Sequence, residues 1–163
     1  MKLYNTNCLD YLKSEQFQKD VGGGWQALIV TDPPFNVGYH YNTYKDKMSE
    51  QEYLYFLNQV FKANNTPYVV IHYPESLYKI ALYNGDVPTR VCSWVYNSNT
   101  AKQHRDIAFF GVLPKESIVI DPFMGSGTTG VACKELGYEF IGCEIDSEYF
   151  DIAKERLEEI KLF

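Results

Sequence analysis

Short, continuous apolar runs alternate along this chain with longer segments whose apolar residues recur at helical spacing. A short continuous apolar run is typical of a strand that is buried on both faces of a sheet. Helices between such strands form βαβ crossovers, which produce a parallel sheet covered on both sides. The pattern therefore predicts an α/β fold with a doubly wound, mostly parallel sheet.

The predicted strands lie at residues 2–4, 27–31, 68–73, 92–96, 117–120 and 139–143. Helical spacing predicts helices around residues 9–17, 53–61, 77–81, 131–136 and 147–160. The polar stretch 97–106 is predicted to be a functional loop, followed by a junction near residue 113. In a doubly wound sheet, ligands bind beyond the carboxyl ends of the strands, so the residues that follow each strand are the candidates for chemistry.

The 163 residues are enough for one globular domain with its own core. No apolar run approaches the roughly 20 residues of a membrane-spanning helix, and residues 1–5 lack the apolar core of a signal peptide, so a cytoplasmic protein with no membrane partner is expected. The four cysteines have no CxxC spacing, which favours reduced core thiols and predicts no metal site. A formal net charge of −6 argues against nucleic-acid binding over the whole surface, but leaves room for a local basic groove.

A carboxylate, two prolines and an aromatic ring follow the predicted strand 27–31, in the order Asp32-Pro33-Pro34-Phe35. The prolines fix φ and lack an N–H group, so they form a stiff turn with free carbonyl oxygens. Such a group can accept hydrogen bonds from an amino group while the ring stacks on a planar ligand. From these four residues alone, a simple turn is an equal alternative.

Glycines follow the predicted strand 117–120, in the order Asp121-Pro122-Phe123-Met124-Gly125-Ser126-Gly127-Thr128-Thr129. They permit a tight strand-to-helix turn whose backbone amides approach a ligand closely. The turn is not a Walker loop, because no lysine precedes the threonine pair, and the dinucleotide fingerprint also fails. The next predicted strand leads into Glu144, a carboxylate well placed to bind ribose hydroxyls. Together these features predict a nucleoside-binding half.

These motifs together resemble the DNA amino-methyltransferases, which act on adenine N6 or cytosine N4. Residues 32–35 resemble the catalytic motif of that family, and residues 121–129 resemble its S-adenosylmethionine motif. A catalytic motif that precedes the cofactor motif is the order of the permuted β-class enzymes. The flanking segments 7–10 and 137–146 also match, so the resemblance covers roughly residues 1–75 and 114–160.

The resemblance implies the class I S-adenosylmethionine-dependent methyltransferase fold, which is Rossmann-like. It implies one catalytic domain over residues 1–163, with a catalytic half at 1–113 and a cofactor-binding half at 114–163. It also associates the chain with restriction–modification and with phage DNA methylation.

The implied activity is methyl transfer from S-adenosylmethionine to the N6 amine of adenine in DNA. The preference for adenine N6 over cytosine N4 rests on an Asp in the first motif position. The base leaves the duplex, Phe35 stacks on it, and Asp32 and the Pro33 carbonyl accept the two amino hydrogens. The implied catalytic residues are Asp32, Pro33, Pro34 and Phe35. The implied cofactor-binding residues are Asn7, Cys8, Asp121, Phe123, Gly125, Gly127, Thr128, Glu144 and Ile145.

The chain departs from the family between its two halves, where a long target-recognition region and a His-Pro and Lys-Pro segment are usual. Only residues 74–113 stand there, which predicts that the target-recognition region is missing and that activity is weakened or relaxed. A homodimer or a separate recognition subunit is the expected means of engaging DNA. Two other functions stay open: a cytosine N4 or RNA-directed methyltransferase, and a non-catalytic nucleoside-binding or assembly subunit.

Three further features have two interpretations each. Lys102, His104 and Arg105 form a basic cluster that contacts phosphates or, as is favoured, belongs to a solvated loop. His72 is expected to be a hydrogen-bonded core histidine rather than a base. The tyrosines of residues 39–44 are equally a mobile lid over the base or a packed part of their own loop.

Overall fold

The computed structural model describes residues 1–22, 26–40, 42–44, 46–96 and 104–159. Within them one seven-stranded sheet runs in the order β1-β7-β6-β2-β3-β5-β4. The strands are β1 (Lys2–Asn5), β2 (Gln26–Thr31), β3 (Tyr68–His72), β4 (Pro88–Val95), β5 (His104–Phe110), β6 (Ser117–Asp121) and β7 (Glu139–Glu144). The helices are α1 (Cys8–Leu12), α2 (Glu15–Val21), α3 (Glu50–Phe61), α4 (Pro74–Asn84), α5 (Thr128–Leu136) and α6 (Ser147–Glu159), with a 3-10 turn η1 (Ala63–Asn65).

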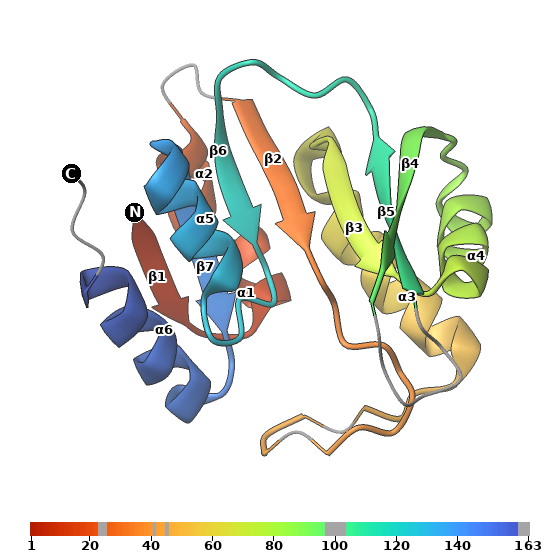
Figure 1. Cartoon of the computed structure of the whole chain (residues 1–163), viewed down its shortest axis with the longest axis horizontal. Coiled ribbons are helices and arrows are strands. Elements are labelled where there is room, and N and C mark those ends of the chain that lie inside the picture. The colour runs from red at the N-terminus through yellow and green to blue at the C-terminus, as the bar shows by residue number, and fades with distance from the viewer. Residues whose placement is uncertain (23–25, 41, 45, 97–103, 160–163) are drawn as a thin grey trace.

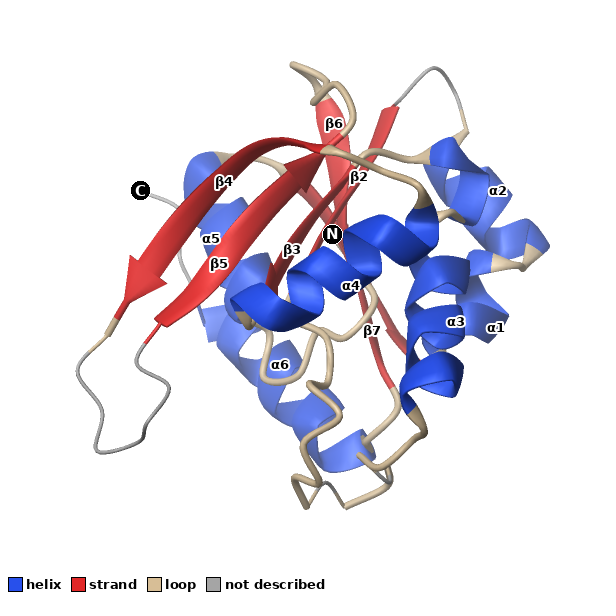
Figure 2. Cartoon of the chain, turned by 90° about the vertical axis from the view of Figure 1, so that its right-hand side faces the viewer, coloured by secondary structure: helices blue, strands red, loops and turns tan. Residues whose placement is uncertain are grey.

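The sheet is parallel from β1 to β3 and antiparallel at its far edge. β1, β7, β6, β2 and β3 pair in parallel, whereas β5 is antiparallel to both β3 and β4. Helices lie on both faces: α5 and α6 cover one face, and α1 to α4 cover the other (Figures 1 and 2). The doubly wound, mostly parallel α/β prediction is therefore confirmed.

Two apolar cores fill the space between the sheet and its helices. The larger core joins α1 to α4 with the central strands, and three α3 residues in it (Leu57, Val60 and Phe61) are fully buried. The smaller core lies under α5 and α6, around Phe140 and Ala153. No helix in the described part of the chain is both long enough and apolar enough to cross a membrane.

The predicted loop over residues 97–106 is wrong where the structure describes it. Residues 104–106 begin β5, which continues through Phe110, and residues 97–103 lie outside the described residues. The polar start of this strand concealed it, because β5 is stabilised by antiparallel pairing with β3 and β4 rather than by a continuous apolar run. The last helix ends at Glu159 in the described chain, and Ile160 lies outside it.

The four cysteines differ in their surroundings. Cys8, Cys133 and Cys143 are buried free thiols, as expected, whereas Cys92 is exposed on the edge strand β4. Burial raises the pKa of Cys8 to about 12 and that of Cys133 to about 11, so both stay protonated at neutral pH.

A buried carboxylate, Asp20, connects the N-terminal elements. Its oxygens accept hydrogen bonds from Lys2 Nζ at 2.6 Å, from the hydroxyls of Tyr4 and Tyr11 at 2.7 Å each, and from Gln16 Nε2 at 2.9 Å. Burial alone would raise the pKa of Asp20, but these hydrogen bonds outweigh it and lower the pKa to about 2. Asp20 therefore stabilises the junction of β1, α1 and α2 as an ion.

Replacing Asp20 with alanine is expected to lower the free energy of unfolding by about 2 kcal/mol, because two tyrosine hydroxyls and a lysine lose their shared acceptor. A lowered pKa stabilises the fold above the unfolded value near pH 4, so the difference from wild type should shrink as the pH falls toward 2. Urea unfolding at several pH values measures this. Glu15→Ala is the control, since Glu15 forms an exposed pair with Lys19 at 3.8 Å and should change stability by less than about 0.5 kcal/mol.

Candidate functional site

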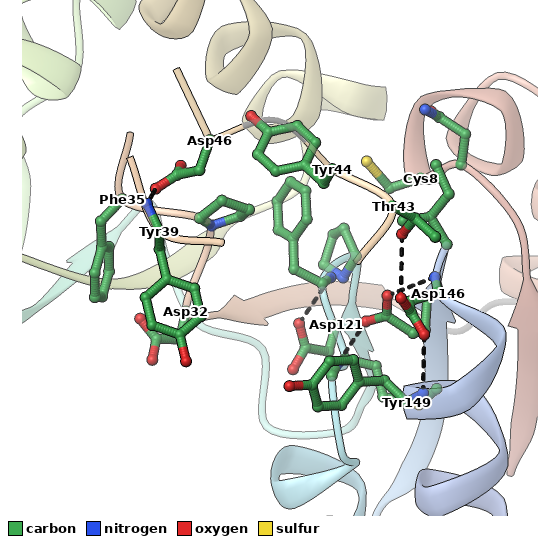
Figure 3. Close-up of a pocket in the computed structure, with 18 of the residues that line it drawn as sticks. Cys8, Asp32, Phe35, Tyr39, Thr43, Tyr44, Asp46, Asp121, Asp146 and Tyr149 are labelled. Atoms are coloured by element: carbon green, nitrogen blue, oxygen red, sulfur yellow. Dashed lines mark hydrogen bonds between the residues drawn. The ribbon is translucent and has the colours of Figure 1, made fainter. Parts of the chain in front are cut away.

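A cavity of about 780 Å³ lies beyond the carboxyl ends of β2, β6 and β7. Each of these strands contributes an acidic residue to its lining: Asp32 after β2, Asp121 at the end of β6 and Glu144 at the end of β7. Figure 3 shows Asp32 and Phe35 at one end of the cavity, Cys8 and Asp146 at the other, and Asp121 between them. This is the edge of the sheet where a doubly wound fold binds its ligands.

Most of the residues expected at the site line this one cavity. From the four-residue turn these are Asp32, Pro34 and Phe35, and from the expected cofactor set they are Asn7, Cys8, Asp121, Phe123, Gly125, Thr128, Glu144 and Ile145. Two expected residues, Pro33 and Gly127, are not among the described lining residues. Pro33 is buried. Gly127 has φ of +82° and faces α6, where a Cβ would lie 3.0 Å from that of Ala153, so a glycine there permits close packing of α5 on α6.

A chain of hydrogen bonds through Tyr53 and His72 holds the Asp32-Pro33-Pro34-Phe35 turn in place. Tyr53 of α3 donates its hydroxyl proton to the Pro34 carbonyl at 2.6 Å, and its oxygen lies 2.8 Å from Nε2 of His72. The backbone N–H of Tyr73 donates to Nδ1 of His72 at 2.8 Å, so Nε2 carries the proton of a neutral imidazole. His72 is fully buried, which confirms that it is a hydrogen-bonded core histidine.

The Asp32 side chain is exposed toward the open cavity but surrounded by its walls. This partial desolvation raises the pKa of Asp32 to about 6, an increase that Arg105 opposes and Asp121 assists. Asp32 is therefore a carboxylate at neutral pH, yet a stronger proton and hydrogen-bond acceptor than an ordinary aspartate.

Arg105 lies at the same end of the cavity, in strand β5. Its guanidinium carbon is 4.5 Å from the centre of the Phe35 ring. The favoured interpretation of a solvated loop is thus wrong for Arg105, because strand pairing directs the half-buried side chain into the cavity. Of the other two members of the cluster, His104 is exposed at the start of β5, and Lys102 lies outside the described residues.

The loop after Phe35 is organised around a second buried carboxylate, Asp46. It accepts the backbone N–H groups of Asn36 at 2.7 Å and of Val37 and Tyr39 at 3.0 Å each. Farther along, the Thr43 hydroxyl donates to Asp146 at 3.3 Å, which connects the loop to the opposite wall. These contacts fix the loop backbone, whereas the Tyr39 side chain is 62% exposed. Tyr41 lies outside the described residues.

Asp121 lies at the floor of the cavity and connects three elements. Its carboxylate accepts hydroxyl protons from Thr31 of β2 and Thr129 of α5, both at 2.6 Å, and the backbone N–H of Phe123 at 3.1 Å. Desolvation raises the pKa of Asp121, and the hydrogen bonds from both threonines and the Phe123 N–H oppose this increase. Asp121 fixes the glycine turn relative to β2, the strand that Asp32 follows.

Glu144 connects the two halves of the expected nucleoside site. One carboxylate oxygen accepts the backbone N–H of Gly125 at 2.8 Å, and the other accepts that of Asp146 at 2.9 Å. The Gly125 backbone has φ of +53°, which favours glycine at this turn. Both oxygens keep further lone pairs that can accept from a ligand hydroxyl.

Asn7 and Cys8 line the cavity, and Cys8 lies at the end away from the Asp32-Phe35 turn (Figure 3). The Asn7 side-chain oxygen accepts the backbone N–H of Leu9 at 2.9 Å and so caps α1. Beside them, Ile145 presents a side chain that is 46% exposed. An apolar side chain that is open to the cavity provides a contact surface for a planar ligand.

Comparisons with known proteins match both the sequence and the fold. Residues 112–155 match the N6_N4_Mtase family, described as DNA methylase. Type II methyltransferase M.HpaI of Haemophilus parainfluenzae is 26% identical over 212 residues, which cover 80% of this chain and 68% of that protein. Type II methyltransferase M.SmaI of Serratia marcescens is 59% identical over 39 residues, but this match spans only 24% of this chain and 13% of that protein. These matches support the DNA amino-methyltransferase family.

Solved structures of DNA methyltransferases have the same fold. The M1.HpyAVI–SAM complex superposes with a TM-score of 0.67 and 22% identity, covering 96% of this chain and 98% of that one. The cytosine-N4-specific PvuII DNA methyltransferase superposes with a TM-score of 0.72 and 13% identity, covering 98% of this chain and 87% of that one. The chain therefore has the class I methyltransferase fold.

Two residues of the site, Asp46 and Tyr53, were not identified from the sequence, and they hold the Asp32-Phe35 turn and the loop after it through hydrogen bonds. Arg105 was considered only as a phosphate contact or a solvated residue, and it enters the cavity from an antiparallel strand. For Arg105 there was a signal, because Arg105, Ile107 and Phe109 alternate with residues that face the other side of the sheet. No local pattern identifies Asp46, whose role depends on how the loop folds back.

Proposed function

We propose that this chain is an S-adenosylmethionine-dependent DNA amino-methyltransferase, or the catalytic core of one, acting on adenine N6. The observation that carries this proposal is that the Asp32-Phe35 turn, the glycine turn at Gly125 and the Glu144 side chain line a single cavity. One end offers an amino-group acceptor and an aromatic ring, and the other offers a nucleoside-binding acid. A methyl donor and an amine acceptor can therefore meet in one cavity.

The cavity lining fits a cationic nucleoside. It contains five carboxylates, namely Asp32, Asp46, Asp121, Glu144 and Asp146, and one cationic side chain among the described residues. Such a lining favours a ligand with sulfonium and ammonium groups. When bound, S-adenosylmethionine supplies an electrophilic methyl group. Glu144 would accept the ribose hydroxyls, and Ile145 with the Asn7-Cys8 turn would contact the adenine.

At the other end, Asp32 and Phe35 would hold the target base. Phe35 provides a ring for stacking on a base that has left the duplex. The Asp32 carboxylate accepts a hydrogen of the exocyclic amine, and this draws electron density toward the nitrogen lone pair that attacks the methyl group. After transfer, the new ammonium nitrogen loses one proton, and a carboxylate with a pKa of about 6 is able to accept it.

The choice of adenine over cytosine rests on Asp in the first motif position. Cytosine N4 remains the second candidate, because the PvuII enzyme, described as cytosine-N4-specific, has the same fold. Both bases present an amine beside a ring nitrogen, so the described pocket residues serve either one. The chemical product decides between them.

We also propose that a target-recognition region found in relatives is missing here. The alignment with M.HpaI runs over 212 residues, more than the 163 of this chain, so that relative has residues with no counterpart in this one. Sequence-specific readout needs side chains delivered into a DNA groove. A second copy of the chain or a separate recognition subunit would supply that surface.

The direct test is transfer of a tritiated methyl group from labelled S-adenosylmethionine to unmethylated genomic DNA. We expect incorporation, with N6-methyladenine as the product on nucleoside analysis. N4-methylcytosine would instead assign the second candidate. Cofactor binding without incorporation into DNA or RNA would support a non-catalytic nucleoside-binding subunit, and calorimetry with S-adenosylhomocysteine measures that binding independently.

A further inference from the structure

Arg105 lies against a group of aromatic rings at the catalytic end of the cavity. Its guanidinium carbon is 4.5 Å from the ring centre of Phe35 and 5.5 Å from those of Tyr73 and Tyr96. These distances are within the range of cation–π attraction. Arg105 thus contacts the ring that is proposed to stack on the target base.

The charge of Arg105 is unusual at this site. Among the described residues that line the cavity, it is the one cationic side chain beside five carboxylates. It acts on Asp32 electrostatically, yet no ion pair within 4.0 Å joins the two residues in the described chain. The positive charge is therefore near the carboxylate without occupying its hydrogen-bonding positions.

The hydrogen bonding of Arg105 is also incomplete. Its Nε is buried and has no hydrogen-bond partner among the described residues. A buried donor without a partner costs free energy, so its persistence indicates a role other than fold stabilisation. The side chain lies in the cavity wall and is held there mainly by ring contacts.

We propose that Arg105 is a positioning residue for methyl transfer, whose guanidinium holds Phe35 in place for stacking and keeps Asp32 ionised when the base displaces water. This inference rests on the proposed function. Base entry removes water from the Asp32 carboxylate, and a nearby fixed cation offsets the loss of solvation. An ionised Asp32 can accept the amino hydrogen, whereas a protonated one would present its own hydrogen.

The other charged groups around Asp32 either raise its pKa or are already hydrogen-bonded to the backbone. Asp121 from β6 raises the pKa of Asp32, and only Arg105 is identified as lowering it. Asp46, from the loop after Phe35, directs its oxygens to the backbone N–H groups of that loop. Removing the Arg105 charge should therefore move the ionisation of Asp32 to higher pH.

The test compares Arg105→Gln and Arg105→Lys over a range of pH. In Arg105→Gln, the acidic limb of the rate profile should move up by about one pH unit, with an approximately fivefold loss of kcat/KM near pH 6 that approaches tenfold at lower pH and recovers toward pH 9. Arg105→Lys keeps the positive charge, so the acidic limb of its rate profile should stay near that of wild type. Its contact with the Phe35 ring should be weaker than that of the guanidinium. The affinity for S-adenosylhomocysteine, measured by calorimetry, should be unchanged in both variants.

Arg90→Gln is the matched control, since Arg90 is exposed on the neighbouring strand β4 and does not line the cavity. It removes one positive charge and should leave the acidic limb in place. An Arg105→Gln limb that coincides with that of wild type would overturn the proposal.

A second measurement does not depend on catalysis. Carboxyl ¹³C NMR titration should show Asp32 ionising at higher pH in Arg105→Gln than in wild type. If wild type transfers no methyl group but this titration moves, the proposed function fails and the Asp32–Arg105 coupling stands. If the titration does not move, the inference about Arg105 fails whether or not the enzyme is active.

Discussion

Methyl transfer by an Asp32→Ala variant should be about 10²- to 10³-fold slower than by wild type, because the transition state loses the acceptor that pulls on the amino hydrogen. S-adenosylhomocysteine binding should change by less than about twofold, because Asp32 follows β2 and Glu144 ends β7, and β6 lies between these two strands. Initial rates at saturating cofactor, together with calorimetry, measure the two effects separately.

Asp32→Asn is the informative partner variant. The amide keeps one acceptor oxygen of similar position, so it should retain more activity than alanine does. Wild-type activity should fall as the pH decreases through about 6, where Asp32 becomes protonated, whereas the activity of Asp32→Asn should not show this limb. Equal activity of wild type and alanine variant would exclude Asp32 from the chemistry.

Asp32→Asn is expected to increase the stability of the fold although it decreases the activity. A raised pKa means that ionised Asp32 is disfavoured in the folded chain, so its unfavourable contribution develops as the pH rises from about 4 through about 6. Asp32→Asn should therefore raise Tm at pH 8 and have little effect at pH 4. A gain in stability that accompanies a loss of activity would separate a catalytic defect from misfolding.

The second large effect is expected at Glu144. Glu144→Gln replaces one acceptor oxygen by an NH₂ group, so one of the N–H groups of Gly125 and Asp146 faces another donor. The glycine turn then loses its tie to β7, and the proposed ribose contact is weakened as well. We expect S-adenosylhomocysteine to bind about 30- to 100-fold more weakly, corresponding to roughly 2–3 kcal/mol for charge-assisted hydrogen bonds.

Calorimetry measures this affinity, and saturating cofactor should restore much of the methyl-transfer rate, in contrast to Asp32→Ala. Glu148→Gln provides the control, because Glu148 is an exposed acid on α6 whose carboxylate does not line the cavity. Unchanged cofactor affinity in Glu144→Gln would show that ribose binding occurs elsewhere.

Strands β3, β6 and β7 of the parallel part were predictable because most of their residues are buried and apolar. Strand β6, for example, is buried at every position, and both it and its following glycines were identified. The antiparallel edge was predicted only in part. The expected strand 92–96 overlaps β4 (Pro88–Val95), whereas β5 begins with polar residues and was missed.

The same difference between parallel and antiparallel strands explains which site residues were predicted. The residues at the carboxyl ends of the predicted strands include Asp32, Asp121 and Glu144, and the structure brings all three to one cavity. An antiparallel strand reaches that edge with its amino end instead. Arg105 stands near the start of β5 and was therefore assigned to a loop. Tyr53 was identified only as an apolar helix position, since its hydroxyl partner Pro34 is 19 residues away.

The close packing of Gly127 against Ala153 makes the cofactor turn and the last described helix mechanically dependent on each other. A ligand that fixes the turn must also favour the docked state of α6, by the reciprocity of thermodynamic linkage. Local opening of α6 would in turn release the turn and the ligand together, before the larger core around α3 is exposed. Occupancy of the nucleoside site and resistance of this C-terminal helix to fraying are thus two measures of one equilibrium.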